Sequence, residues 1–249
     1  MPLEAEGALL SDRLQEFLGS ETGELAIARI QDLNSLMSYY RCAMMEVVTK
    51  FNVLNEEFSL QFDRDPITGI KSRLKSLPSI IEKLKRRGYP LTLQSIEENL
   101  NDVAGVRVIC SFTEDIQLLS EALMKQDDIS LLELKDYIRN PKPNGYRSLH
   151  MIVSVPIFLA REKRFMRVEI QLRTLAMDTW ATLEHQLRYK KDFDFAESMG
   201  RELYTCAQIS AEMDARMDGL RRLVQEHTEP ESSHMTMGDP NWVDQSRNL

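Results

Sequence analysis

The sequence lacks the features of a membrane-spanning or secreted protein. No apolar run approaches the roughly 18–20 residues that a membrane-spanning helix needs. The N-terminal stretch MPLEAEGALLSDRL is acidic and has no basic segment followed by an apolar one, so it does not read as a signal peptide. The cysteines Cys42, Cys110 and Cys206 are too far apart for a zinc site and odd in number for a disulfide framework. We therefore expect a cytoplasmic protein with reduced thiols.

Three common signatures of phosphate chemistry are also missing. No segment matches the phosphate-binding loop G-x-x-x-x-G-K-[ST], and none matches the Gly-rich dinucleotide fingerprint. None of the 4 histidines is followed by an aspartate, so a metal-dependent phosphohydrolase of the His-Asp type is not expected. Any nucleotide site in this chain must therefore hold phosphates by other means.

The charge of the chain is unevenly distributed. The net charge of −8 argues against a general binder of duplex DNA. Residues 71–87, KSRLKSLPSIIEKLKRR, nevertheless carry seven Lys or Arg against one Glu. This basic segment is either a solvated helix face or a site for a defined polyanion such as a nucleotide.

The spacing of apolar residues predicts helices at both ends of the chain around a central β region. The expected helices are 25–60, a second from about Pro78 to Gly88, 91–100, 113–126, and a helical region from Thr174 broken around Asp192–Asp194. The expected strands are Val103–Phe112, Ile129–Ile138, one along Leu149–Val155, and Phe165–Arg173. The D-x-D spacing at 192–194 falls in the helix break, so we interpret it as a turn or cap.

This order of elements predicts one domain of the α/β (α+β) class, with a mixed sheet flanked by helices. The domain is expected to cover residues 23–226. Residues 1–22 are weakly patterned and are expected to be flexible. Residues 227–249 are polar and contain Ser-Ser, Gly and Pro, which is typical of a disordered tail.

Polar residues alternate along the last expected strand. Side chains of a strand point to opposite faces in turn, so Arg167, Glu169, Gln171 and Arg173 should form one row. Such a row either faces solvent or lines a cleft that binds phosphates and a sugar.

Two charged residues lie at the first expected strand. Asp102 comes directly before it, where a carboxylate can hold Mg²⁺ or simply cap a turn. Arg107 lies inside the apolar strand, and a buried guanidinium needs a partner or a ligand. Its planar group could stack on a purine.

The basic segment and the Gly-containing loop supply further candidates. Ser79 lies near a helix N-terminus, where free backbone N–H groups favour anions, and Lys83 follows on the same helical face. Arg73 and Lys75 come from the extended segment before this helix. The loop 140–150 is rich in polar and aromatic side chains and contains Lys142, Asn144, Tyr146, Arg147 and His150. Tyr146 is either a packing residue or a platform for a base.

Four segments, in this order, resemble the synthetase domain of the RelA/SpoT family, and most closely its stand-alone members, the small alarmone synthetases. They are KSRLKSLPSIIEKL, NDVAGVRVICSF, KDYIRNPKPNGYRSLHMIV and VEIQLRTLAMDTWATLEHQLRYK. The resemblance implies a nucleotidyltransferase-like fold. It also implies Mg²⁺-dependent transfer of the β,γ-pyrophosphate of ATP to the 3′-hydroxyl of GDP or GTP, which gives ppGpp or pppGpp and AMP.

The same resemblance assigns roles to individual residues. Arg73 and Arg107 would sandwich the adenine, and Lys75, Ser79 and Lys83 would hold the ATP phosphates. Asp102 and Glu169 would bind Mg²⁺, with Glu169 also the general base. Tyr146 would stack on the guanine, and the other acceptor-side contacts would be Lys142, Asn144, His150 and Gln171.

The resemblance also bears on partners and regulation. It implies a homotetramer, for which the apolar residues Leu203, Ile209, Met213, Met217 and Leu220 are either interface or ordinary core. The length leaves no room for a hydrolase domain, so synthesis without hydrolysis is expected. An alarmone or an RNA stays open as an allosteric ligand, although residues 69–72 do not map onto such a site.

Two rival functions remain. A different phosphotransferase on the same fold is disfavoured by the loop around Tyr146. A non-catalytic regulator that binds nucleotides or single-stranded RNA is disfavoured because both Asp102 and Glu169 are present.

Overall fold

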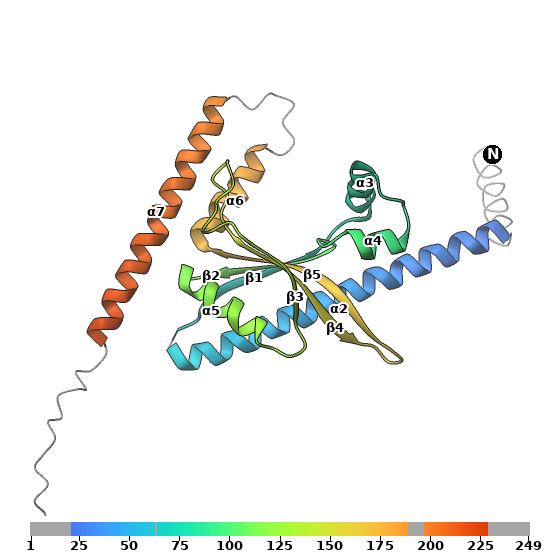
Figure 1. The fold of residues 1–249 in the computed structure, drawn as a ribbon, viewed down its shortest axis with the longest axis horizontal. Helices are drawn as coiled ribbons and strands as arrows, with labels where there is room; N and C mark the ends of the chain where they lie inside the picture. Colours follow the sequence, from blue (N-terminus) through green and yellow to red (C-terminus); the bar gives the residue numbers. More distant parts are fainter. Residues whose placement is uncertain (1–20, 63, 189–196, 229–249) are drawn as a thin grey trace, which may run out of the picture.

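A five-stranded mixed sheet forms the centre of the protein (Figure 1). The computed structural model describes residues 21–62, 64–188 and 197–228. The strand order is β1-β2-β5-β4-β3, with β2 and β5 parallel and all other neighbours antiparallel. The strands are β1 (Ile67–Leu74), β2 (Ala104–Cys110), β3 (Ser130–Asp136), β4 (Leu149–Phe158) and β5 (Lys163–Thr174).

Helices flank the sheet, which confirms the expected mixed α+β class. The helices are α2 (Glu21–Phe62), α3 (Leu77–Arg87), α4 (Leu93–Asn99), α5 (Thr113–Met124), α6 (Leu175–Arg188) and α7 (Glu197–Thr228). Helix α2 runs beneath the sheet from end to end, whereas α3 and α6 lie above it at opposite ends (Figure 1). The site described below lies on the side of α3 and α6.

The long helix α2 covers the apolar face of the sheet. Its buried side chains recur every three or four residues, as an amphipathic helix requires; they are Leu36, Tyr40, Ala43, Val47, Phe51, Leu54 and Phe58. They meet the inward residues of β5, namely Met166, Val168, Ile170 and Leu172, together with α5. This packing directs the alternate row of β5, which contains Glu169, to the other face.

Strand β1 is the main difference from the sequence expectation. Residues 67–74 were expected to include only an extended approach to the basic helix, but they form an edge strand antiparallel to β2. Their burial is irregular and most of the strand stays accessible, because only one side packs on the core. Period-two alternation is therefore weak here, and pairing with β2 decides the conformation.

Helix α7 is attached to the rest of the fold along only part of its surface. Leu203 is buried, but Ile209, Met213, Met217 and Leu220 are exposed, so core packing within residues 21–62, 64–188 and 197–228 does not account for those four. The helix continues to Thr228, past the expected start of the tail at residue 227. The predicted flexible segment before α2, the turn at 192–194 and residues 229–249 lie outside the described residues. No described helix is long and apolar enough to cross a membrane.

Candidate nucleotide-binding site

Strand register aligns polar side chains in rows across the upper face of the sheet. Lys71 of β1 pairs with Arg107 of β2, which pairs with Gln171 of β5, which pairs with His150 of β4. One step along, Arg73 pairs with Gly105, and Gly105 pairs with Glu169. Because Gly105 has no side chain, the floor between Arg73 and Glu169 is open.

Two clefts meet over these rows. The first cleft, about 520 Å³, lies against α6 and is lined by Arg73, Arg107, Tyr146, Gln171 and Arg173, among others. The second cleft, about 320 Å³, lies against α3 and is lined by residues that include Lys83, Arg87, Asp102, Lys135 and His150. Glu169 lines both clefts, so its carboxylate stands where the two spaces join.

Asp102 is held by two lysines. Its Oδ2 accepts hydrogen bonds from Lys75 Nζ at 2.9 Å and contacts Lys83 Nζ at 2.6 Å. Burial alone would raise the pKa of Asp102, but the bonds from Lys83 and Lys75 outweigh it and hold the pKa below its ordinary value. Asp102 is therefore ionised at neutral pH.

The pKa of Glu169 is shifted in the opposite direction, above its ordinary value. Burial raises the pKa of Glu169, and the nearby charge of Asp102 raises it further, against a hydrogen bond from Gln171. Two carboxylates whose surroundings push their pKa values apart are typical of an acid–base site. Of the two, Glu169 is the one suited to accept a proton.

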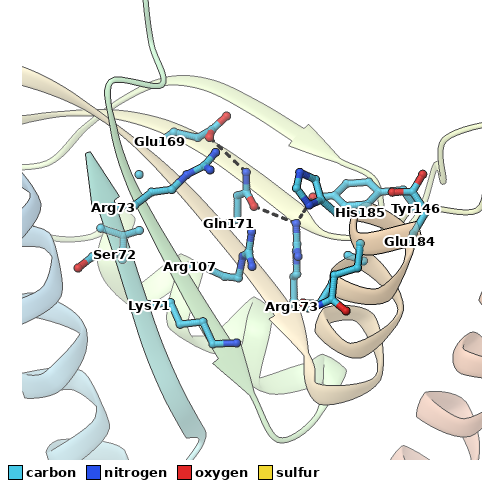
Figure 2. Close-up of a pocket in the computed structure, with 15 residues that line it drawn as sticks. Lys71, Ser72, Arg73, Arg107, Tyr146, Glu169, Gln171, Arg173, Glu184 and His185 are labelled. Carbon is cyan, nitrogen blue, oxygen red and sulfur yellow. Dashed lines mark hydrogen bonds between the residues drawn. The ribbon is translucent and has the colours of Figure 1, made fainter. Parts of the chain in front are cut away.

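A hydrogen-bonded chain crosses the floor of the first cleft. Gln171 donates to Glu169 at 3.2 Å, and Arg173 donates to Gln171 at 2.9 Å and to the Tyr146 hydroxyl at 2.7 Å. Figure 2 shows Glu169 and Arg73 at one end of this chain and Tyr146, with Glu184 and His185 of α6, at the other. The chain orients Tyr146 relative to Glu169.

His150 is a neutral acceptor at the end of this chain. Burial lowers its pKa to about 3, and the positive charges of Arg173 and Lys142 act in the same direction. The Tyr146 hydroxyl lies 2.7 Å from His150 Nε2 and accepts hydrogen bonds from Ser148 and Arg173. With both acceptor positions used, the hydroxyl donates its proton to Nε2.

This environment predicts a pH-dependent stability. Unfolded His150 takes up a proton near its ordinary pKa of about 6.5, but folded His150 does so only near 3. The stability that the protein has while His150 stays neutral is thus fully present above pH 6.5. It is lost as the pH falls toward 3, because protonation favours the unfolded state. Between pH 7 and pH 5, urea unfolding should show that wild type loses on the order of 1–2 kcal/mol more than His150→Asn. Equal losses in the two proteins would contradict this environment.

Asp178 of α6 forms ion pairs with three cations at the end of the first cleft. Lys71 Nζ lies 2.9 Å from its Oδ2, and the guanidinium groups of Arg107 and Arg173 lie 3.3 and 3.2 Å from its Oδ1. Burial opposes its ionisation, but Lys71 and Arg107 hold its pKa below the ordinary value. Arg107 therefore has the partner that its place in an apolar strand demands.

The loop that carries Tyr146 packs closely on α7. Gly145 has φ +88°, and a Cβ added there would lie 2.5 Å from Ala207 Cβ. Tyr146 packs against the cluster of Trp180, Ala181, Leu203 and Ala207. The nearby Lys142 places its ammonium 4.9 Å from the centre of the Tyr146 ring.

Gly145→Ala should lower the free energy of unfolding by about 1–3 kcal/mol, because the new side chain meets both backbone strain and Ala207. Gly88→Ala is the matched control, since Gly88 has φ +71° but nothing within 4 Å of an added Cβ. Urea unfolding should rank Gly145→Ala below Gly88→Ala, with partial recovery in Gly145→Ala/Ala207→Gly. Equal costs at the two glycines would contradict the close packing on α7.

The structure gathers most of the candidate residues around the two clefts. Those that line a cleft are Arg73, Lys83, Asp102, Arg107, Tyr146, His150, Glu169 and Gln171. Lys75 reaches the site through Asp102, and Asn144 donates to Glu184 at 3.4 Å. Ser79 lies in the first turn of α3, bonded to Ser76, and is not among the lining residues. Of the polar row on β5, Arg167 bonds instead to Glu98 and Asn101.

Several site residues were not among the sequence candidates. They are Lys71, Ser72, Arg87, Glu133, Lys135, Asp178, Glu184 and His185. Arg173 was predicted as part of the polar row of β5, and the structure places it in the first cleft. Glu184 lines the first cleft, and Asp178 pairs with its cations, only because α6 folds back over the sheet, which no local pattern indicates.

The carboxylates of the second cleft fit a divalent cation. Oδ1 of Asp102 is buried and has no hydrogen-bond partner among the described residues, so it can accept a ligand. Glu169 lines the same cleft. Within the described ranges no group of three or more His, Cys, Asp or Glu could hold a metal by itself. Mg²⁺ is commonly held by one or two carboxylates together with substrate phosphates, which is the donor set available here.

Known proteins resemble this chain in both sequence and fold. The region found in RelA / SpoT proteins matches residues 72–194. GTP pyrophosphokinase YwaC of Bacillus subtilis is 38% identical over 208 residues, which cover 81% of this chain and 99% of that protein. The crystal structure of small alarmone synthetase 1 from Bacillus subtilis bound to its product pppGpp has a TM-score of 0.71 at 34% identity. The match covers 78% of this chain and 99% of the chain in that structure.

A second structure of small alarmone synthetase 1 from Bacillus subtilis is bound to AMPCPP and has a TM-score of 0.67 at 32% identity. This match covers 79% of this chain and 99% of the chain in that structure. The identity to YwaC extends over nearly all of that relative, so the likeness is not confined to a shared motif. This chain belongs to the RelA/SpoT family, alongside the small alarmone synthetases.

Proposed function

We propose that the protein is a GTP pyrophosphokinase that moves the β,γ-pyrophosphate of ATP to the 3′-hydroxyl of GDP or GTP. The products would be AMP and ppGpp or pppGpp. The similarity to YwaC, named a GTP pyrophosphokinase, supports the reaction class. The related synthetase structures with pppGpp and with AMPCPP support two nucleotide substrates.

The position of Glu169 carries the proposal. A transfer between two nucleotides needs a base where the acceptor hydroxyl meets the donor phosphates. Glu169 is the residue shared by both cleft linings, and its raised pKa suits proton acceptance. In the proposed reaction Glu169 takes the proton of the 3′-hydroxyl as that oxygen attacks the β-phosphorus of ATP; the bond from that phosphorus to the α,β-bridging oxygen breaks, and AMP leaves.

The donor nucleotide is proposed to lie across β1, β2 and α3. Arg73 and Arg107 project from the same face of neighbouring strands and would sandwich the adenine. Lys75 and Lys83, which contact Asp102, and Ser79 in the first turn of α3 would hold the phosphates.

The acceptor is proposed to lie against Tyr146. Its ring lines the first cleft and would stack on the guanine. Neutral His150, together with Lys142, Asn144 and Gln171, would contact the sugar and phosphates of the acceptor. The hydrogen-bonded chain from Tyr146 to Glu169 would hold the 3′-hydroxyl near its base.

Asp102 and Glu169 would hold Mg²⁺ together with the donor phosphates. When bound, Mg²⁺ would supply positive charge that offsets the charge of the transferred group. Asp102 is suited to this role because its lysines keep it ionised. In the structure, Lys75 and Lys83 both contact Asp102 itself.

We also propose a homotetramer in the cytoplasm. The exposed apolar residues of α7, which are Ile209, Met213, Met217 and Leu220, are the proposed contact surface. Size-exclusion chromatography with light scattering should give four times the chain mass of 28.8 kDa. A monomer, or a tetramer that persists when Met213 and Met217 are both changed to Glu, would contradict this surface.

The reaction is tested with purified protein, γ-labelled ATP, Mg²⁺ and either GDP, GTP or GMP, resolved by ion-exchange chromatography. A labelled product that elutes as ppGpp or pppGpp, with AMP in equal amount, is expected. Addition of EDTA should abolish it. No labelled product with any guanine nucleotide, from folded protein that binds ATP, would overturn the proposal and favour a non-catalytic regulator.

A further inference from the structure

Helix α7 contributes a buried carboxylate beside the proposed acceptor site. Asp214 is 9% exposed, although α7 is otherwise largely accessible. Its Oδ2 accepts a hydrogen bond from Arg147 Nη1 at 3.1 Å and another from Thr174 Oγ1 at 3.0 Å. A buried aspartate that makes two such bonds is a fixed connection point between elements.

The two partners of Asp214 belong to two of the segments that line the first cleft, the Tyr146 loop and β5. Arg147 directly follows Tyr146 in the loop of residues 137–148, between β3 and β4. Thr174 is the last residue of β5, and its Oγ1 also accepts the backbone N–H of Met177 at the start of α6. Asp214 thus connects the Tyr146 loop to the strand that carries Glu169.

Contacts from several elements hold the loop: the Tyr146 hydroxyl bonds to Arg173 and His150, and Asn144 donates to Glu184 of α6. Within the loop, Gly145 donates to Lys142 O at 2.8 Å and Lys142 donates to Tyr146 O at 3.1 Å. These bonds define the shape of the loop but not its position. Its position relative to α7 depends on the close approach of Gly145 to Ala207 and on the Arg147–Asp214 ion pair.

We propose that Asp214 is a positioning residue for the acceptor nucleotide, acting through Arg147 on Tyr146. This inference rests on the proposed function, because it assigns Tyr146 to the guanine. Asp214 lines neither cleft and touches no substrate in this scheme. Its role is to hold the Tyr146 ring at the distance from Glu169 that the acceptor spans.

The test compares steady-state kinetics and nucleotide binding of wild type, Asp214→Ala, Arg147→Ala and the double variant. Misplacement of a binding group by about 1 Å can cost up to about 100-fold. We expect the KM for GDP to rise about tenfold or more in each single variant, whereas the Kd for ATP and the kcat at saturating GDP change little. The double variant should be no worse than either single variant, since both act through one contact. Asp214→Asn, which keeps an acceptor oxygen, should recover part of the affinity.

Asp218→Ala is the matched control. Asp218 lies one turn further along α7 and accepts the backbone N–H of Thr113 at 3.3 Å, so it attaches α7 to α5 and not to the loop. It should alter thermal stability without raising the KM for GDP. If Asp218→Ala raises that KM as much as Asp214→Ala, the effect is general loosening of α7 and the inference is wrong.

The outcomes separate this inference from the proposed function. Active wild-type protein beside an Asp214→Ala variant with an unchanged KM for GDP overturns the inference alone. Wild-type protein that neither binds GDP nor forms product overturns the proposed function, and the positioning role with it. Additive effects of the Arg147 and Asp214 substitutions would show that they do not act through one contact.

Discussion

Replacement of Glu169 by glutamine should lower kcat by about 100- to 10,000-fold, the range that loss of a general base produces. Glutamine has nearly the same shape and can still accept the hydrogen bond that Gln171 donates, so the floor of the cleft should persist. What is lost is the ability to take the proton of the 3′-hydroxyl. In the absence of Mg²⁺, ATP and GDP should bind with Kd values within about threefold of wild type, because general-base loss affects the transition state more than the ground state.

The pH dependence gives a second readout for the same variant. Burial and the charge of Asp102 raise the pKa of Glu169, so wild-type activity should rise with pH through a value above the ordinary glutamate range. The residual activity of Glu169→Gln should lack that rise. Glu97→Gln is the control, since this carboxylate pairs with Arg164 outside both clefts. A Glu169→Gln variant that keeps more than about a tenth of wild-type kcat would exclude the role as base.

Asp102→Asn should cost a similar factor, about 100-fold or more, but through the donor nucleotide. Asparagine removes the negative charge that faces Lys75 and Lys83 and leaves a poorer ligand for a divalent cation. Without Mg²⁺, ATP should bind the variant at least as tightly as wild type, because the two lysines no longer pair with a carboxylate. With Mg²⁺, the gain in ATP affinity that wild type shows should be absent. Calorimetric titration of ATP with and without Mg²⁺ measures both.

Loss of the Asp102 charge should also change Glu169. One cause of the raised pKa of Glu169 disappears, so the pH profile of the remaining activity should shift to lower pH. Asp128→Asn is the control, because Asp128 also pairs with a lysine, Lys50, far from the clefts. An Asp102→Asn variant whose ATP affinity still responds to Mg²⁺ as wild type does would contradict the proposed metal role.

Local patterns were sufficient for much of the fold. The three- and four-residue spacing in 25–60 predicted α2 because one helix face must be buried. The alternation in Phe165–Arg173 predicted β5 and the common face of Glu169, Gln171 and Arg173 for the same kind of reason. Where one face of an element is regularly buried, the order of apolar and polar residues predicts whether that element is a helix or a strand.

Local patterns failed where long-range pairing decides the conformation. Strand β1 is irregular in burial, and its identity as a strand comes from its register with β2. The local pattern also did not decide whether the polar row of β5 faces solvent or a cleft. That depends on α3 and α6 folding over the same face of the sheet. Such contacts join residues far apart in the chain, and no short window contains both partners.

The sequence by itself determined which residue types are available for chemistry and on which face of their own element they lie. The four segments that resemble the RelA/SpoT family, confirmed by the comparisons, also identified the reaction class. Only the tertiary structure placed Glu169 at the junction of two clefts, gathered three cations on Asp178, and brought Asp214 of α7 against the Tyr146 loop. The reason is physical: alternation and helical period are local constraints, whereas the separation of two side chains on different elements depends on strand register and helix packing across the whole domain.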